Sequence, residues 1–156
     1  MTVVAPSPAD RDAVADLLGR APLGDFDIVA RAADGAPIVI RNAPLLDDGT
    51  PMPTRYWLVG AAERVAIGRL EAAQGVNRAE AAVDVDDLAD AHRRYAAERD
   101  SALPADHAGS RPFGGVGGTR QGVKCLHAHY AWLLAGGDDP VGRWVAARLA
   151  AGEGER

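Results

Sequence analysis

The residues best suited to chemistry lie in one stretch, from Phe113 to Tyr130. Glycines occupy all but one of positions 114 to 118, and a lysine, the chain's single cysteine and two of its four histidines follow. We find no other segment that concentrates reactive side chains in this way. The candidate site residues in this stretch are Gly114, Gly115, Gly117, Gly118, Thr119, Lys124, Cys125, His127 and His129.

The glycine-rich run suits anion binding. Successive glycines let backbone N–H groups converge on an anion, and a helix that begins just after them adds positive potential. Thr119 and Lys124 would add a hydroxyl and a charge to a bound phosphate or carboxylate. The spacing is neither that of a P-loop nor that of a dinucleotide-binding fingerprint. The alternative is a tightly turned connector that binds nothing.

The cysteine and the two histidines raise the question of a metal site. In a strand, Cys125, His127 and His129 would all point to one side. In a helix, Cys125 and His129 share a face, whereas His127 lies nearly opposite. Because we expect a helix here, Cys125 and His129 are the predicted ligands of any metal, with zinc as the candidate ion. Further ligands would come from His92, His107, Asp106 or Glu71. The simpler interpretation is a buried helix that needs no cofactor.

A nucleophilic role for Cys125 is the third interpretation. A helix N-terminus, Lys124 and a neighbouring histidine would lower the pKa of the thiol, and His127 or His129 would act as the base. The stretch matches no protease or phosphatase signature. An enzyme built on it would be a hydrolase or transferase of phosphoryl or acyl groups.

A proline-rich loop over residues 42–54 is the second candidate region. Arginine suits bidentate recognition of phosphate or carboxylate, and arginines stand on both sides of the loop. Alternatively, Tyr56 and Trp57 pack on opposite faces of a sheet and the arginines lie in water or in ion pairs. The candidate ligand-binding residues here are Arg41, Thr54, Arg55 and Tyr56.

The strand pattern predicts a small antiparallel sheet. Short runs rich in β-branched and aromatic residues alternate with turn residues, and the Asp34-Gly35 dipeptide is typical of a hairpin. The expected strands are Phe26–Ala30, Ile38–Ile40 and Arg55–Val59.

Capping residues and helical periodicity predict about five helices packed with this sheet, which makes an α+β fold. Ser7 and Pro8 begin the first helix, and Asp139 with Pro140 begin the last. Thr119 is expected to cap a helix over residues 121–135. A helix over residues 63–73 is expected to turn Val65, Ile67 and Leu70 inward and to stop at Gly75. Asn77 is expected to cap a further helix, and another helix is expected over residues 86–103.

The bulk composition indicates one domain over residues 1–156, with its core at about 7–150 and a frayed tail at 151–156. The net charge of -5 argues against nucleic-acid binding. The single cysteine excludes an intrachain disulfide and fits a reducing compartment. No apolar run reaches the length of a membrane span, and the start does not read as a signal peptide. We therefore expect a cytoplasmic protein.

Three parts of the sequence carry a resemblance to a known family: residues 37–44 with 48–58, residues 69–71, and residues 115–118 with 123–129 and 136–142. Together they resemble the bacterial domain-of-unknown-function family 501, over roughly residues 18–149. The family has no established activity to carry over. Its genes often stand beside a septum-formation initiator and an exopolyphosphatase-type enzyme in actinobacteria-like genomes, which implies a link to the envelope or to division. Members often carry a cysteine where this chain has Ala32, so a site with two thiolates is not expected.

These observations predict a regulatory module that binds a small anion or a protein partner near Gly114–Gly118. The alternative is a hydrolase or transferase that uses the glycine-rich loop and the segment from Lys124 to His129 as its active site.

Overall fold

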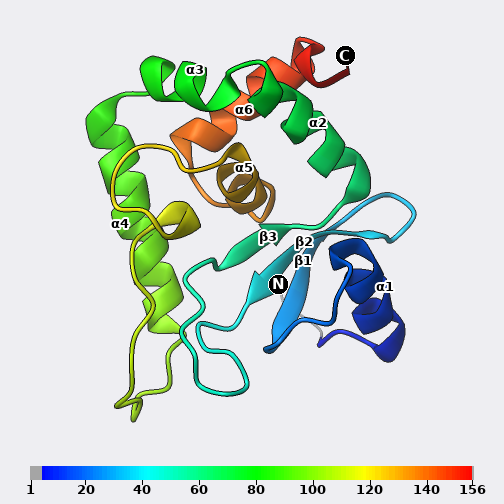
Figure 1. The fold of residues 1–156 in the computed structure, drawn as a ribbon, viewed down its shortest axis with the longest axis vertical. Helices are drawn as coiled ribbons and strands as arrows, with labels where there is room; N and C mark the ends of the chain where they lie inside the picture. The colour runs from blue at the N-terminus through cyan, green and yellow to red at the C-terminus, as the bar shows by residue number, and fades with distance from the viewer. Residues whose placement is uncertain (1–4, 156) are drawn as a thin grey trace.

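The structure of the chain is a computed structural model, which describes residues 5–155. Within that range it contains a three-stranded antiparallel sheet and six α-helices, which confirms the predicted α+β fold (Figure 1). No helix in the described range is long and apolar enough to cross a membrane. The elements are α1 (Pro8–Leu18), β1 (Phe26–Arg31), β2 (Pro37–Asn42), β3 (Tyr56–Leu58), α2 (Ala61–Ala72), α3 (Gly75–Ala82), α4 (Val85–Ser101), the 3-10 turn η1 (Val116–Gly118), α5 (Leu126–Leu134), α6 (Pro140–Ala150) and the 3-10 turn η2 (Glu153–Glu155).

The sheet runs in the order β1-β2-β3, so β3 is an edge strand. The predicted hairpin turn joins β1 to β2, with Gly35 at φ 89° and the Asp34 carboxylate accepting from the N–H of Ala36. In the β2–β3 pair, Arg41 lies opposite Tyr56. This register places the end of the proline-rich loop at the open edge of the sheet.

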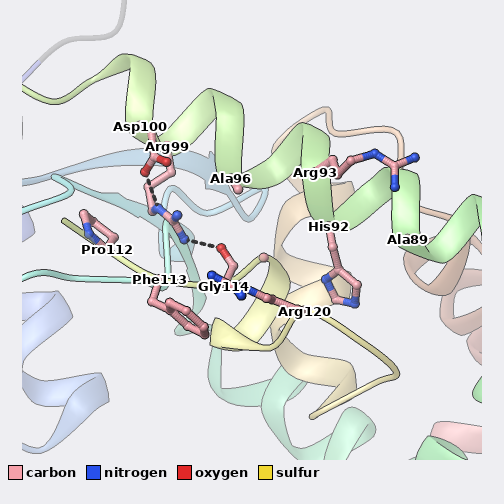
Figure 2. A pocket seen from close by; sticks show the side chains of 11 residues that line it. Ala89, His92, Arg93, Ala96, Arg99, Asp100, Pro112, Phe113, Gly114 and Arg120 are labelled. Atoms are coloured by element: carbon pink, nitrogen blue, oxygen red, sulfur yellow. Dashed lines mark hydrogen bonds and ion pairs between the residues drawn. The ribbon is translucent and has the colours of Figure 1, made fainter.

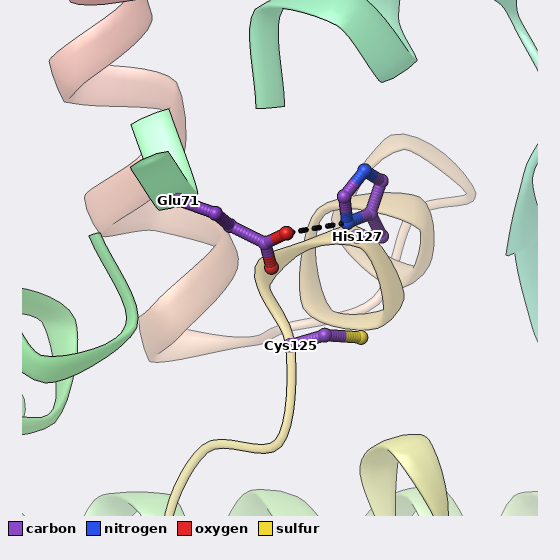
Figure 3. A group of neighbouring side chains, drawn as sticks. All are labelled: Glu71, Cys125 and His127. Carbon is purple, nitrogen blue, oxygen red and sulfur yellow. Dashed lines mark ion pairs between the residues drawn. The ribbon is translucent and has the colours of Figure 1, made fainter. Parts of the chain in front are cut away.

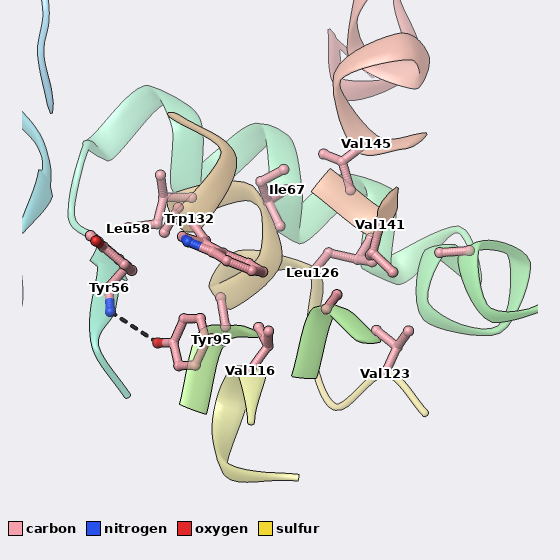
Figure 4. Packing of buried hydrophobic residues seen from close by; sticks show 14 of the residues in the cluster. Tyr56, Leu58, Ile67, Tyr95, Val116, Val123, Leu126, Trp132, Val141 and Val145 are labelled. Atoms are coloured by element: carbon pink, nitrogen blue, oxygen red, sulfur yellow. Dashed lines mark hydrogen bonds between the residues drawn. The ribbon is translucent and has the colours of Figure 1, made fainter. Parts of the chain in front are cut away.

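Each face of the sheet carries its own apolar cluster, because successive side chains of a strand point to opposite faces. On the α1 face, Val14 packs with Phe26, Ile28 and Ile40, and Trp57 lies against them. On the other face, Tyr56 and Leu58 join a larger cluster supplied by the helices that follow the sheet (Figure 4). Tyr56 and Trp57 therefore pack on opposite faces, as one interpretation of the sequence expects.

The predicted starts of the first and last helices are confirmed. The hydroxyl of Ser7 accepts from the N–H of Asp10, whose carboxylate accepts from the N–H of Ser7 in return, and Pro8 opens α1. In α6, the carboxylate of Asp139 accepts from the N–H of Val141, and Pro140 is the first helical residue.

The predictions for the region around α2 are partly wrong. Ile67 and Leu70 are buried as expected, but Val65 is 52% exposed because a residue two positions before Ile67 lies on the opposite side of a helix. Gln74 adopts the left-handed conformation, and Gly75 begins α3 instead of ending a helix. A Cβ on Gly75 would lie 2.5 Å from the carbonyl oxygen of Leu70, so this close approach requires glycine.

Asn77 does not cap a helix. It lies inside α3, where its side-chain amide donates to the side chain of Gln74. The reversal at Gln74 lets α3 begin earlier than the expected cap position.

The helix predicted over residues 121–135 begins five residues late, and Thr119 does not cap it. Gly122 has φ 67°, which an α-helix does not accommodate, and Cys125 is fully extended at φ -153° and ψ 153°. Thr119 instead donates its hydroxyl to the carbonyl of Gln121. As a result, α5 starts at Leu126 and Cys125 is its N-cap residue.

The tail that was expected to fray forms η2 over Glu153–Glu155, and Arg156 lies outside the described residues. Gly154 is buried, and its carbonyl accepts from Arg69 of α2. Glu153 forms an ion pair of 2.8 Å with Arg78 of α3. These contacts hold the described part of the tail against the helices.

Candidate functional site

A cavity of about 480 Å³ lies between β3 and the first turn of α5, and we call it the β3–α5 cleft. It brings together parts of both regions singled out in the sequence, although they are some seventy positions apart. The predicted site residues that line it are Thr54, Tyr56, Gly117, Lys124, Cys125 and His127.

The charge of the cleft is positive. Lys124 lies at one side, and Arg64 of α2 lies at another, where it also donates to the carbonyl of Leu17. None of the described residues that line the cleft is a carboxylate, and neither cation forms an ion pair within residues 5–155. Leu18, Trp57 and Leu58 supply an apolar wall. This lining suits an anion that is attached to an apolar body.

Cys125 meets His127 and Glu71 at the α5 side of the cleft (Figure 3). One oxygen of Glu71 lies 3.2 Å from Nδ1 of His127, and the other accepts from the N–H of Leu126 at 2.8 Å. One potential ligand atom from each of the three side chains lies within 4.8 Å of the other two. Of the further ligands considered from the sequence, Glu71 is the one that the fold brings here.

The predicted pairing of Cys125 with His129 is wrong. Because Cys125 precedes the helix and is extended, the four-residue helical spacing does not apply to it. His129 is buried, with Nδ1 2.6 Å from the Asp139 carboxylate that caps α6. It therefore ties α5 to α6, and it does not line the β3–α5 cleft.

The two other histidines also have partners away from Cys125. Nδ1 of His92 accepts from the N–H of Val116 and its Nε2 lies 2.8 Å from the carbonyl of Gly122, so the neutral ring connects the middle of the glycine-rich run to the segment that follows it. Burial lowers the pKa of His92, which favours that neutral form. Nε2 of His107 lies 2.8 Å from the carbonyl oxygen of Ser110.

The predicted activation of Cys125 is also wrong in direction. Burial raises the pKa of the Cys125 thiol above its ordinary value, and this outweighs the N–H groups of Ala128 and His127 and the charge of Lys124. The His127 nitrogen that faces Glu71 is Nδ1, and Figure 3 shows the other ring nitrogen turned away from Cys125. A nucleophilic role for Cys125 with His127 as its base stays a prediction.

The glycine-rich loop is closed largely by its own hydrogen bonds. The N–H of Gly115 donates to the carbonyl of Thr119 at 2.7 Å, and that of Gly118 donates to Gly115. Gly114 has φ 76°, and a Cβ there would lie 2.4 Å from the carbonyl oxygen of Gly118, so this turn needs glycine. Gly117 faces the β3–α5 cleft. Anion binding by the loop's other residues stays a prediction.

Gly114 and Gly115 line a different hollow, of about 370 Å³, together with residues of α4 (Figure 2). Arg99 stands at its floor and is only 1% exposed. Its guanidinium donates to the carbonyls of Gly114 and Pro53 and pairs with Asp100. Arg99 thus joins the glycine-rich loop to the proline-rich loop and holds both beside the cleft.

Arg99 was not among the predicted site residues, although the sequence carries a signal for it. Leu88, His92, Tyr95 and Arg99 recur at helical spacing and form the buried side of α4. The hydroxyl of Tyr95 accepts from the N–H groups of Arg55 and Tyr56 and so fixes the start of the edge strand.

The arginines near the proline-rich loop lie away from Lys124. Arg41 pairs with Asp27 at 3.0 Å, and Arg55 donates to the carbonyl of Asn42 at 2.6 Å. Both line a smaller hollow of about 180 Å³. Burial lowers the pKa of Arg55, and their role in ligand binding stays a prediction.

Tyr56 lines the β3–α5 cleft, but its hydroxyl is engaged elsewhere. It donates to the Glu98 carboxylate on α4. Burial and this hydrogen bond raise the pKa of Tyr56 to about 12, so the phenol stays neutral. Tyr56 therefore presents an uncharged surface to a ligand in the cleft.

The fold and the cleft describe a small α+β protein with a cationic, partly apolar hollow at the edge of its sheet. Over residues 28–147 the chain matches the family described as "Protein of unknown function (DUF501)", and it belongs to that family. The family assignment made from sequence motifs is thereby confirmed. No curated protein and no solved structure matches the chain. The matched range includes the cleft residues from Thr54 to Ala128.

Proposed function

We propose that this protein is a binding module for a small organic anion, which it holds in the β3–α5 cleft by a phosphate or carboxylate group. The observation that carries this proposal is the gathering of Lys124, Arg64 and the start of α5 around one apolar wall. The volume of about 480 Å³ lies in the range of roughly 300–1,000 Å³ that is typical of small-molecule sites.

The start of α5 strengthens the attraction for an anion. The N–H groups of a first helical turn lack partners within the helix and carry a partial positive charge. In α5 the N–H of Leu126 donates to Glu71, and the N–H groups of His127 and Ala128 face the Cys125 thiol, while both of these residues line the cleft with Lys124. An anionic group beside Lys124 would gain a charge-assisted hydrogen bond from the lysine and would interact favourably with the partial positive charge of this turn.

The apolar wall favours a ligand with a hydrophobic part over a bare ion. Trp57 and Leu58 come from the edge strand, and Leu18 comes from the end of α1. An aromatic or aliphatic group of the ligand would bury its surface against them, at about 25 cal/mol per Å² of apolar area removed from water.

Binding rather than catalysis is the function that the site supports. Burial raises the pKa of the Cys125 thiol, and His127 is oriented toward Glu71, which favours binding over nucleophilic catalysis. A regulatory role in envelope growth or division is part of this proposal and rests on the gene neighbourhood of the family that the sequence resembles.

The Lys124→Gln variant is expected to bind phenyl phosphate about 10-fold more weakly than the wild type. A hydrogen bond to a charged group is worth about 1.5–3 kcal/mol, and about 1.4 kcal/mol corresponds to a factor of ten in affinity. The measurement is calorimetric titration with phenyl phosphate and with inorganic phosphate, in the presence of a chelator. Phenyl phosphate should bind more tightly than inorganic phosphate.

The matched control is Arg93→Gln, which removes one positive charge from a side chain that is 70% exposed and lines the α4 hollow. Its affinity for phenyl phosphate should stay within about twofold of the wild type, because surface charges are largely screened at about 0.15 M salt. Equal losses in the two variants, or no binding by the wild type, would contradict the proposal.

A further inference from the structure

We propose that Glu71, Cys125 and His127 form a binding site for a divalent metal ion of the zinc type at the wall of the β3–α5 cleft. The inference rests on these three side chains and is independent of the anion proposed above. It concerns a function that the anion-binding module does not require.

The three side chains converge because two elements meet at the start of α5. Cys125 is extended just before the helix, and His127 lies in its first turn, so both reach the same side (Figure 3). Glu71 comes from the last turn of α2. Oxygen, sulfur and nitrogen atoms of these groups already lie within 4.8 Å of one another.

A tetrahedral zinc ion needs only a small contraction of this group. Zinc bonds of about 2.0–2.3 Å place its ligand atoms about 3.3–3.6 Å apart. One oxygen of Glu71 and Nδ1 of His127 are already 3.2 Å apart. The side chains of Glu71 and His127 are 25% and 32% exposed, so they have room to adjust and a metal ion can reach them.

The second oxygen of Glu71 supports the same arrangement. It accepts the N–H of Leu126 at 2.8 Å, which fixes the carboxylate at the start of α5 and leaves the first oxygen turned to His127. Hydrogen bonds that orient metal ligands in this way are a regular part of protein metal sites.

The donor set selects the metal. Thiolate and imidazole are ligands of zinc and of similar transition metals, whereas magnesium and calcium take oxygen ligands. Binding converts the Cys125 thiol to a thiolate and releases its proton to water, after which thiolate and carboxylate together balance the two positive charges of the ion. Three protein ligands leave a fourth position for water or for an anion in the cleft.

The test is titration of the purified, metal-free protein with Co²⁺ and Zn²⁺ in phosphate-free buffer. We expect one ion per chain, a thiolate-to-cobalt charge-transfer band in the near ultraviolet, and displacement of cobalt by zinc. Cys125→Ser should abolish that band and lower zinc affinity by more than about 10-fold. Loss of a residue that only hydrogen-bonds to a metal ligand already lowers metal affinity by about 10–100-fold. His127→Gln should lower affinity similarly.

His107→Gln is the matched control, since it removes a loop histidine that lies outside the group. His107→Gln is expected to bind zinc with the affinity of the wild type. A substitution of Glu71 would also remove its hydrogen bond with Leu126, so Cys125→Ser is the deciding variant. Its unfolding temperature without metal must first be shown to match that of the wild type. The inference is overturned if the wild type binds no stoichiometric zinc, or if Cys125→Ser binds it as tightly. The phenyl phosphate titration contains chelator, so its outcome separates failure of the anion site from failure of the metal site.

Discussion

Asp139→Ala is expected to lower the free energy of unfolding by about 3–5 kcal/mol, the usual effect of leaving one partner of a buried pair alone. One oxygen of Asp139 lies 2.6 Å from Nδ1 of His129, and both side chains are almost fully buried. The other oxygen caps α6 through the N–H of Val141. Nε2 of His129 has no hydrogen-bond partner among the described residues, so the variant would leave the whole ring unsatisfied.

The adjacent residue provides the control for this effect. Asp138 is 75% exposed and pairs with Arg143 at the surface. Asp138→Ala should cost less than about 1 kcal/mol, because exposed ion pairs contribute little. Urea-induced unfolding of both variants would measure the difference. If the two losses agree within about 1 kcal/mol, the pair formed by Asp139 and His129 does not stabilise the junction of α5 and α6 as described.

Arg99→Ala is expected to lower the free energy of unfolding by about 2–6 kcal/mol, because two carbonyls lose their charged donor. The guanidinium donates to the carbonyls of Pro53 and Gly114 and is 1% exposed. A carbonyl that loses its donor while shielded from water costs about 1–3 kcal/mol. Because Arg99 holds both loops, the variant should also weaken phenyl phosphate binding in the neighbouring cleft.

Arg99→Lys should recover only part of the lost stability. The ammonium group of lysine lacks the planar arrangement of N–H donors with which the guanidinium of Arg99 reaches two carbonyls at once. Arg93→Ala, on the exposed side of the same helix, should cost less than about 1 kcal/mol. Urea unfolding of the three variants gives the comparison. A loss below about 1 kcal/mol for Arg99→Ala would show that the two loops hold their places without this tie.

The features predicted well from the sequence are those that local interactions determine. The Ser7 and Pro8 start of α1, the turn at Gly35 and the start of α6 each depend on residues within a few positions of one another. The opposite packing of Tyr56 and Trp57 follows from strand geometry alone. The three-stranded sheet was predictable for the same reason.

The errors occur where local signals compete with backbone strain or with distant contacts. The apolar pattern around α5 extends upstream, but Gly122 takes a positive φ and Cys125 an extended conformation, so the helix begins only at Leu126. Glycine at position 75 looks like a helix stop, yet it is needed for the close approach of α3 to Leu70. The neighbouring Gln74 takes the left-handed conformation instead.

The candidate site was predicted only in part. Lys124, Cys125 and His127 are close in the sequence and were found together. Glu71 was one of two carboxylates named as further ligands, but its contact with the N–H of Leu126 spans 55 positions. Arg64 was not predicted, because the sequence of α2 does not indicate which elements the ends of this helix will contact. Contacts of this kind are set by how α2 packs against α5, which no local pattern specifies.

The most direct test of the central claim uses the chain's single cysteine, which lines the β3–α5 cleft. The rate at which a thiol reagent labels Cys125 would be measured with chelator present, with and without saturating phenyl phosphate. We expect the ligand to slow labelling of the wild type several-fold and, at the same concentration, to have a much smaller effect on Lys124→Gln. If phenyl phosphate binds while Cys125 is labelled at an unchanged rate, the ligand sits elsewhere and the proposed site is wrong.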